Sequence, residues 1–218
     1  MINQQPITHH IHFVRHGDVA VNTDICYGQL DCDVADSFQQ ELVKLNHFIH
    51  QKDWFSEKQI QQATIISSPL RRCLRLAKGL EASLNMDFEL KTEAGFKEIN
   101  FGDWEGLSWE TIGRNNIEKW NDNLLEYRFP HGESASEFDQ RVITAWQQLL
   151  QTLNQSTKSK VIIVVTHAGV IRSILSHFLH IPLAQSLSLN IDKLSISSIR
   201  YLPEHPSLSR CLGVNLTL

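Results

Sequence analysis

A short apolar stretch, Ile11–Val14, runs directly into Arg15-His16-Gly17. A neutral imidazole nitrogen can act as a nucleophile, and a neighbouring guanidinium can grip a phosphate through two parallel hydrogen bonds. Gly17 permits a sharp backbone turn, so the apolar stretch is predicted to be a buried strand that delivers both side chains to a loop. His16 is the candidate nucleophile and Arg15 a candidate phosphate ligand. The same string also fits a structural histidine, so the rest of the chain must decide.

Two further apolar stretches end near residues of the same kind. Ala63–Ser67 precedes Arg72, and Val161–Val165 precedes His167. In a parallel sheet the carboxyl ends of the strands meet at one edge, where ligands bind. Arg72 and His167 are therefore expected to gather around His16 and to bind phosphate oxygens. The helix expected after His167 would add its N-terminal N–H groups to such a site.

Phosphoryl transfer to His16 also requires an acid that protonates the departing oxygen. Glu98 is the preferred donor; as a carboxylate it would then activate the water that hydrolyses a phosphohistidine. Asp18, two residues after His16, is the second candidate. No carboxylate cluster has magnesium or zinc spacing, so the sequence predicts neither a metal nor a cofactor.

The elements that must position these side chains alternate between strand and helix. Apolar residues recur at helical spacing in residues 34–49, 70–80, 138–153 and 171–178. Short strands are expected at residues 11–15, 63–67, 88–91, 161–165, 196–201 and 211–216. This order predicts an α/β protein, a three-layer α/β/α sandwich with a mostly parallel central sheet, in one domain spanning residues 1–218.

Helix starts and one irregular segment are also recognisable. Ser68 before Pro69 fits an N-cap, and the sequence Ser134–Glu137 is a capping box. Residues 103–133 are predicted to form a lid that carries Trp104, Trp109 and Trp120. These indoles are expected either to stack on a substrate ring or to anchor the segment to the core.

Composition limits the partners. The 218 residues carry a formal net charge of −4, and hydrophobic residues make up 42%. This charge disfavours a nucleic-acid partner, and no apolar run is long enough to span a membrane. The polar stretch Met1–His10 does not resemble a signal peptide, and the four cysteines form no CxxC pair, so reduced thiols in the cytoplasm are expected. His9, His10 and His12 are expected at the surface.

The motifs together resemble the histidine phosphatase superfamily, also called phosphoglycerate-mutase-like. The matching blocks follow the family's order: Arg15-His16-Gly17, Ser68-x-Leu70-x-Arg72-Cys73, Glu98 with Gly102-x-Trp104-Glu105-Gly106, Gly132-Glu133-Ser134, and Thr166-His167-Ala168-Gly169-Val170-Ile171-Arg172. The resemblance implies a metal-independent phosphomonoesterase that works through a phosphohistidine at His16. It also implies a substrate-phosphate role for Asn22 and favours Arg72 over Arg71 as the phosphate ligand.

Within the superfamily, the loop Cys26–Asp31 is similar to that of alpha-ribazole phosphatases, which act in cobalamin biosynthesis. That branch usually has Thr after the catalytic His, where this chain has Gly17. A broad-specificity phosphatase of sugar phosphates or nucleotides, a phosphoglycerate mutase and a protein phosphohistidine phosphatase are the alternatives. The mutases resembled here carry Arg and Tyr just after the acid, whereas this chain has Ile99-Asn100-Phe101, which favours hydrolysis. A non-catalytic phosphate-binding protein would not need Glu98. The expected partner is a small phosphate ester, and the protein is expected to be a monomer or homodimer.

Overall fold

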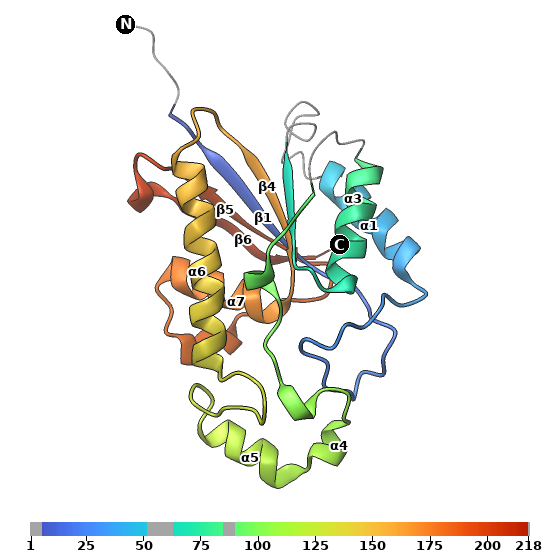
Figure 1. Cartoon of the computed structure of the whole chain (residues 1–218). Coiled ribbons are helices and arrows are strands. Elements are labelled where there is room, and N and C mark those ends of the chain that lie inside the picture. The colour runs from blue at the N-terminus through green and yellow to red at the C-terminus, as the bar shows by residue number, and fades with distance from the viewer. Residues whose placement is uncertain (1–5, 52–62, 85–89, 218) are drawn as a thin grey trace, which may run out of the picture.

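The computed structural model describes residues 6–51, 63–84 and 90–217 (Figure 1). Its strands form one sheet in the order β3-β2-β4-β1-β5-β6. The strands β3, β2, β4 and β1 are parallel to one another, whereas β5 is antiparallel to both β1 and β6. The predicted α/β class with a mostly parallel sheet is confirmed. The strand bounds are β1 His9–Arg15, β2 Thr64–Ser67, β3 Lys91–Thr92, β4 Val161–Thr166, β5 Ile196–Tyr201 and β6 Arg210–Leu216.

Helices cover both faces of this sheet (Figure 1). The helices are α1 Phe38–Gln51, α3 Arg71–Ser83, α4 Trp109–Ile112, α5 Arg114–Asp122, α6 Ala135–Asn154 and α7 Ala168–Leu179; short 3-10 helices occupy Ala94–Phe96, Gly102–Trp104, Leu183–Ser188 and Pro206–Leu208. Successive side chains of β4 point to opposite faces, as the pleat requires. Ile163 packs with α1 and α3, while Ile162 and Val164 pack with α6 and α7. The predicted three layers are therefore present.

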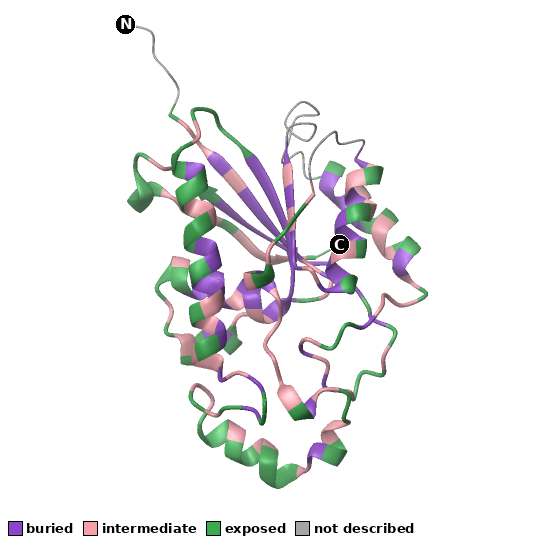
Figure 2. Ribbon diagram, viewed as in Figure 1, coloured by how far each residue is buried: buried purple, intermediate pink, exposed green. Residues whose placement is uncertain are grey.

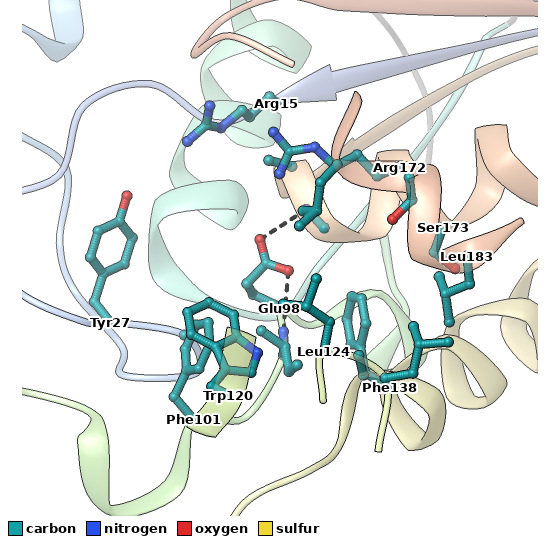
Figure 3. Close-up of a pocket in the computed structure, with 18 of the residues that line it drawn as sticks. Arg15, Tyr27, Glu98, Phe101, Trp120, Leu124, Phe138, Arg172, Ser173 and Leu183 are labelled. Carbon is teal, nitrogen blue, oxygen red and sulfur yellow. Dashed lines mark hydrogen bonds between the residues drawn. The ribbon is translucent and has the colours of Figure 1, made fainter. Parts of the chain in front are cut away.

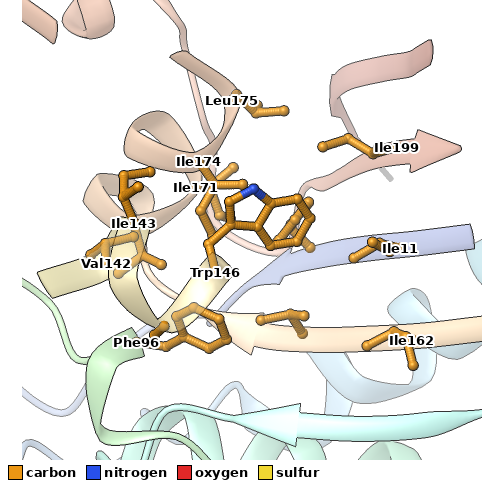
Figure 4. Close-up of a cluster of buried hydrophobic side chains, with 14 of the residues drawn as sticks. Ile11, Phe96, Val142, Ile143, Trp146, Ile162, Ile171, Ile174, Leu175 and Ile199 are labelled. Carbon is orange, nitrogen blue, oxygen red and sulfur yellow. The ribbon is translucent and has the colours of Figure 1, made fainter. Parts of the chain in front are cut away.

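The layer beneath α6 and α7 is centred on Trp146 (Figure 4). Its indole is 1% exposed and lies 5.8 Å from the ring of Phe13, measured between centroids. Phe13 belongs to β1, so this packing fixes the strand that leads to His16. In the burial view the central strands β1 and β4 are almost continuously buried between the helices, whereas β3 and β6 contain no buried residue (Figure 2). The site is thus built at the end of a rigid strand.

One of the two predicted helix starts is correct and the other is wrong. The capping box is present, because the Ser134 hydroxyl accepts from the Glu137 N–H and the Glu137 carboxylate accepts from the Ser134 N–H. Helix α3, however, begins at Arg71 with Leu70 as its N-cap, not at Ser68. The Ser68 hydroxyl instead lies 2.8 Å from Nε2 of His167. The same hydroxyl accepts from the Leu70 N–H at 3.3 Å, so Ser68 stabilises the turn that leads into α3 and does not cap the helix itself.

The expectation that the N-terminal histidines lie at the surface is wrong for His9 and His12, which are 0% and 3% exposed. Both belong to β1, a central strand covered on both faces. His12 Nδ1 lies 2.8 Å from the hydroxyl of Ser198, and burial lowers the pKa of His12 to about 3. The ring is therefore neutral at ordinary pH.

Two further observations bear on the sequence predictions. The described part of β3 begins at Lys91, and residues 88 and 89 of the predicted strand lie outside the described residues. Among the helices of the described ranges, none combines the length and the apolar character that crossing a membrane requires.

Candidate active site

The carboxyl ends of β1, β2 and β4 meet at one edge of the sheet, as predicted. The His16 N–H donates to the carbonyl of Thr166 at 3.0 Å, and the Ser68 N–H donates to the carbonyl of Val165 at 2.9 Å. These bonds bring the side chains after the strands together. The rings of His16 and His167 lie 5.2 Å apart, and Arg72 Nε lies 3.2 Å from His16 Nε2.

His16 has its ring orientation fixed by its own turn. Nδ1 lies 2.8 Å from the carbonyl oxygen of Gly17. A carbonyl only accepts, so in the neutral ring Nδ1 carries the proton and Nε2 carries the lone pair. Burial, aided by the neighbouring Arg72 and Arg15 cations, holds the pKa of His16 well below its usual 6.5. His16 is therefore a neutral imidazole whose Nε2 can act as a nucleophile.

Arg72 and Arg15 bring positive charge to this nucleophile without a carboxylate partner among the described residues. The Arg72 guanidinium is held by backbone carbonyls: Nη1 donates to Leu30 at 2.9 Å and Nη2 to Gly28 at 2.6 Å. Arg15 Nη1 donates to the carbonyl of Ile191 at 2.6 Å. Because a carbonyl oxygen neutralises no charge, both cations keep an attraction for an anionic ligand.

His167 and Asn22 are placed differently from each other. His167 is fully buried beside His16, and burial together with Arg72 lowers its pKa well below the usual value. Asn22 is exposed, and its backbone carbonyl accepts from the Ile25 N–H. Neither belongs to the residues that line the cavity described below. The phosphate contacts of both side chains stay predictions.

The two candidate acids are clearly distinguished. The Glu98 carboxylate lines the cavity and accepts from the backbone N–H groups of Gly169 and Ile99, each at 3.2 Å. Asp18 is exposed and paired with Lys193, whose hydrogen bond lowers the pKa of Asp18 and keeps it ionised. The position of Glu98 therefore suits a proton donor, and that of Asp18 does not. The Gly169 N–H, expected to face phosphate, is instead occupied by Glu98.

A cavity of about 440 Å³ opens over these groups. Figure 3 shows Arg15 on one side, Phe101, Trp120 and Phe138 on the other, and Glu98 between them. Further apolar side chains line it: Ile25, Ile99, Trp109, Leu124, Leu125, Leu183 and Leu187. The cavity thus combines the cationic side chains of Arg15 and Arg72 with an apolar lining. This combination suits a phosphate on a bulky organic group.

The three indoles divide between the two predicted roles. Trp109 and Trp120 line the cavity and stack nearly parallel, with ring centroids 6.5 Å apart. Trp104 is buried and packs edge-on against Phe129 at 4.9 Å. Trp104 therefore anchors the segment, while Trp109 and Trp120 are available to a ligand.

Arg172 is a cavity residue to which the sequence motifs assigned no role. Its Nε donates to the carbonyl of Leu189 at 2.9 Å, and burial, with the nearby Arg15 cation, lowers its pKa. Figure 3 shows it close to Arg15 on the polar side of the cavity. It follows Ala168 by four residues on α7, and both line the cavity. That helical spacing was a signal readable in the sequence.

Metal ligands are not gathered in the described ranges: no group of three or more His, Cys, Asp or Glu side chains there could hold an ion.

Comparison with known proteins gives one family. The profile of the histidine phosphatase superfamily (branch 1) matches residues 11–212. Phosphoglycerate mutase-like protein 4 of Arabidopsis thaliana is 28% identical over 166 residues, covering 74% of this chain and 67% of its own length. A provisionally named phosphoserine phosphatase 2 of Hydrogenobacter thermophilus is 25% identical and covers 91% of this chain and 92% of its own length.

Solved structures share the fold at low sequence identity. A mycobacterial glucosyl-3-phosphoglycerate phosphatase has a TM-score of 0.78 and 20% identity, covering 96% of this chain and 100% of that one. A provisionally assigned alpha-ribazole-5'-P phosphatase of Escherichia coli has a TM-score of 0.80 and 18% identity, covering 96% and 98%. At this identity the similarity shows the fold alone.

Proposed function

Because this chain belongs to the histidine phosphatase superfamily, we propose that it hydrolyses phosphate monoesters through a phosphohistidine at His16. The observation that carries this proposal is the neutral His16 ring, whose Nε2 accepts a hydrogen bond from Arg72 Nε at 3.2 Å. This N–H must turn to a phosphoryl oxygen before Nε2 attacks. A neutral nitrogen can attack phosphorus, and fixed cations stabilise the charge on the transferring group.

The reaction proceeds in two displacements. His16 Nε2 forms a bond to phosphorus while the bond to the ester oxygen breaks, and the carboxylic acid of Glu98 protonates that oxygen. The Glu98 carboxylate then takes a proton from water, whose oxygen attacks phosphorus and displaces Nε2. Arg15 and Arg72 bind the phosphoryl oxygens throughout, with Asn22 and His167 as the additional ligands. No step requires a metal ion or a cofactor.

The test replaces His16 with alanine and measures hydrolysis of p-nitrophenyl phosphate. We expect activity to disappear, and rapid quenching of the parent in alkali to trap phosphate on His16, detected by mass spectrometry of its peptide. His205→Ala, which removes an exposed imidazole, is the matched control and should keep parental activity. Turnover by His16→Ala at the parental rate, or phosphate trapped on another residue, would overturn the proposal.

For the substrate, we propose alpha-ribazole 5'-phosphate. The apolar walls formed by Trp109, Trp120 and Leu124 suit a planar, weakly polar leaving group. The loop similar to the alpha-ribazole phosphatase branch contributes Tyr27 and Gly28 to the same cavity. The decisive measurement is kcat/KM for alpha-ribazole phosphate beside 3-phosphoglycerate, phosphoserine and common sugar phosphates. A higher value for any of the others would refute this substrate.

Arg172 favours a second candidate, a phosphatase for an ester that carries another anionic group, such as phosphoserine. Its guanidinium lies at the cavity without a carboxylate ion pair among the described residues. Arg172→Gln should then lower kcat/KM for phosphoserine far more than for alpha-ribazole phosphate. A mutase is disfavoured because Ile99 and Phe101, both apolar, line the cavity just after the acid.

The domain organisation, oligomeric state and location of the protein are also proposed. Residues 1–218 act as a single domain, as a monomer or homodimer, with residues 103–133 as the lid. All four cysteines are free thiols, which fits a reducing compartment and supports placement in the cytoplasm. A small phosphate ester, rather than a nucleic acid, is the proposed partner.

A further inference from the structure

One peptide group connects two loops at the bottom of the site. The carbonyl of Gly28 accepts from Arg72 Nη2 at 2.6 Å. The N–H of the same peptide, contributed by Gln29, donates to the Glu105 carboxylate at 2.7 Å. The Gly28–Gln29 peptide thus links the Glu105 carboxylate, bound at its N–H, to the buried Arg72 guanidinium, bound at its carbonyl.

This amide is part of the support that orients Arg72. The guanidinium has five N–H donors. Three of them are engaged within the described residues: one faces His16, and two donate to the carbonyls of Gly28 and Leu30. These carbonyls lie on either side of Gln29, so a shift of this turn would rotate the plane of the guanidinium.

Glu105 in its turn holds the loop around Gln29 in place. Besides the Gln29 N–H, its Oε1 accepts from the N–H of Phe101 at 3.0 Å. Gly28 permits this close approach, because a Cβ there would lie 2.2 Å from the carbonyl oxygen of Ile99 and 2.7 Å from Glu105 Oε1. The Gln29 side chain completes the connection by donating to the carbonyl of Glu98 at 3.0 Å.

We propose that Glu105 is a positioning residue for Arg72, acting through the Gly28–Gln29 peptide. The inference rests on the proposed function, since it assigns Arg72 to the phosphoryl group. A carboxylate in direct contact with Arg72 would compete with phosphate for the same N–H groups. Acting through an amide, Glu105 polarises the carbonyl that holds the guanidinium and leaves its other donors available to the ligand.

The experiment measures phosphate binding rather than turnover, so it is independent of the identity of the nucleophile. Isothermal titration with inorganic phosphate is performed on the parent, Glu105→Gln and Glu105→Ala. Loss of a hydrogen bond to a charged group predicts about tenfold weaker binding for Glu105→Ala. Glu105→Gln keeps an acceptor oxygen and should fall between the two. Glu110→Gln removes an exposed carboxylate from the same segment and should bind like the parent.

A second readout reports on Arg72 itself. The Nε–H signal of Arg72 in a proton–nitrogen NMR spectrum, assigned by its disappearance in Arg72→Lys, should shift in Glu105→Gln and stay in place in Glu110→Gln. Unchanged phosphate binding in both Glu105 variants would overturn the proposal. Weaker binding with an unmoved Arg72 signal would also overturn it, because Glu105 would then act by another route. If His16→Ala refutes the phosphohistidine, these titrations still decide the role of Glu105.

Discussion

Replacing Gly169 with alanine should disable the acid without disturbing the fold. Gly169 is the second residue of α7, and its N–H holds the Glu98 carboxylate. A Cβ at this position would lie 2.3 Å from Glu98 Oε1 and 3.2 Å from the ring of Phe138. Ordinary contact begins near 3.4 Å, so the carboxylate would have to move by about 1 Å, and a displacement of this size can cost about 100-fold in rate.

The loss should depend on the leaving group. An alkyl phosphate needs its departing oxygen protonated, whereas p-nitrophenolate leaves without much help. We therefore expect Gly169→Ala to reduce kcat/KM, which reports the steps through departure of the leaving group, by about 100-fold on glycerol 3-phosphate and much less on p-nitrophenyl phosphate. Glu98→Gln should show the same selectivity, and the double variant should be no worse than the more affected single variant, because both changes remove one function.

Stability separates this effect from misfolding. Alanine is the better helix former, by about 0.5–1 kcal/mol, so urea denaturation should show Gly169→Ala to be close to the parent in stability. Equal losses of kcat/KM on the two substrates would show that Glu98 is not the proton donor. Parental kcat and kcat/KM on both would show that its position is not critical.

Other expectations follow from burial and charge. The pKa of His12 near 3, against about 6.5 in the unfolded chain, means that the unfolded state binds more protons between these values. Lowering the pH from 7 to 5 should therefore cost about 2 kcal/mol of unfolding free energy through His12 alone. His12→Asn should reduce the pH dependence measured by urea denaturation by that amount and leave the contributions of His16 and His167, whose pKa values are also lowered. Because the pKa of His16 is depressed, a kcat/KM profile corrected for substrate ionisation should show no loss near pH 6.5; a limb there would contradict a neutral nucleophile. EDTA should leave turnover unchanged, and inactivation that a divalent ion reverses would refute a metal-free reaction. Trp104→Ala should cost about 3–5 kcal/mol of stability, whereas Trp120→Ala should raise KM with a small change in melting temperature; the reverse pattern would exchange their roles.

The sheet could be predicted because its signals are local. Val161–Val165 is apolar at every position, which is what a strand covered on both faces requires, and β4 is buried throughout. The gathering of His16 and Arg72 then follows from parallel topology alone. The burial of His12 could not be predicted in this way. A polar side chain in a strand gives no periodic signal that helices cover both faces of that strand.

The contacts that hold the site residues in place could not be predicted, for a different reason. Glu105 holds the Gln29 N–H from 76 positions away, through two loops without regular structure. Nothing in the spacing of loop residues encodes such a contact, since the chain path between them is set by the packing of the whole segment. The same holds for Ser68, whose hydroxyl contacts His167 instead of capping α3.

Gly17 shows how a departure from a motif can have a local cause. A Cβ on Gly17 would lie 1.9 Å from Glu41 Oε2. That carboxylate is held in place, since it accepts from the Ser37 hydroxyl at 2.7 Å and from the Asp18 N–H at 3.2 Å. Threonine at position 17 would therefore displace Glu41 and release the turn that follows His16. The Glu41 carboxylate of α1 thus occupies the space that a side chain at position 17 would need.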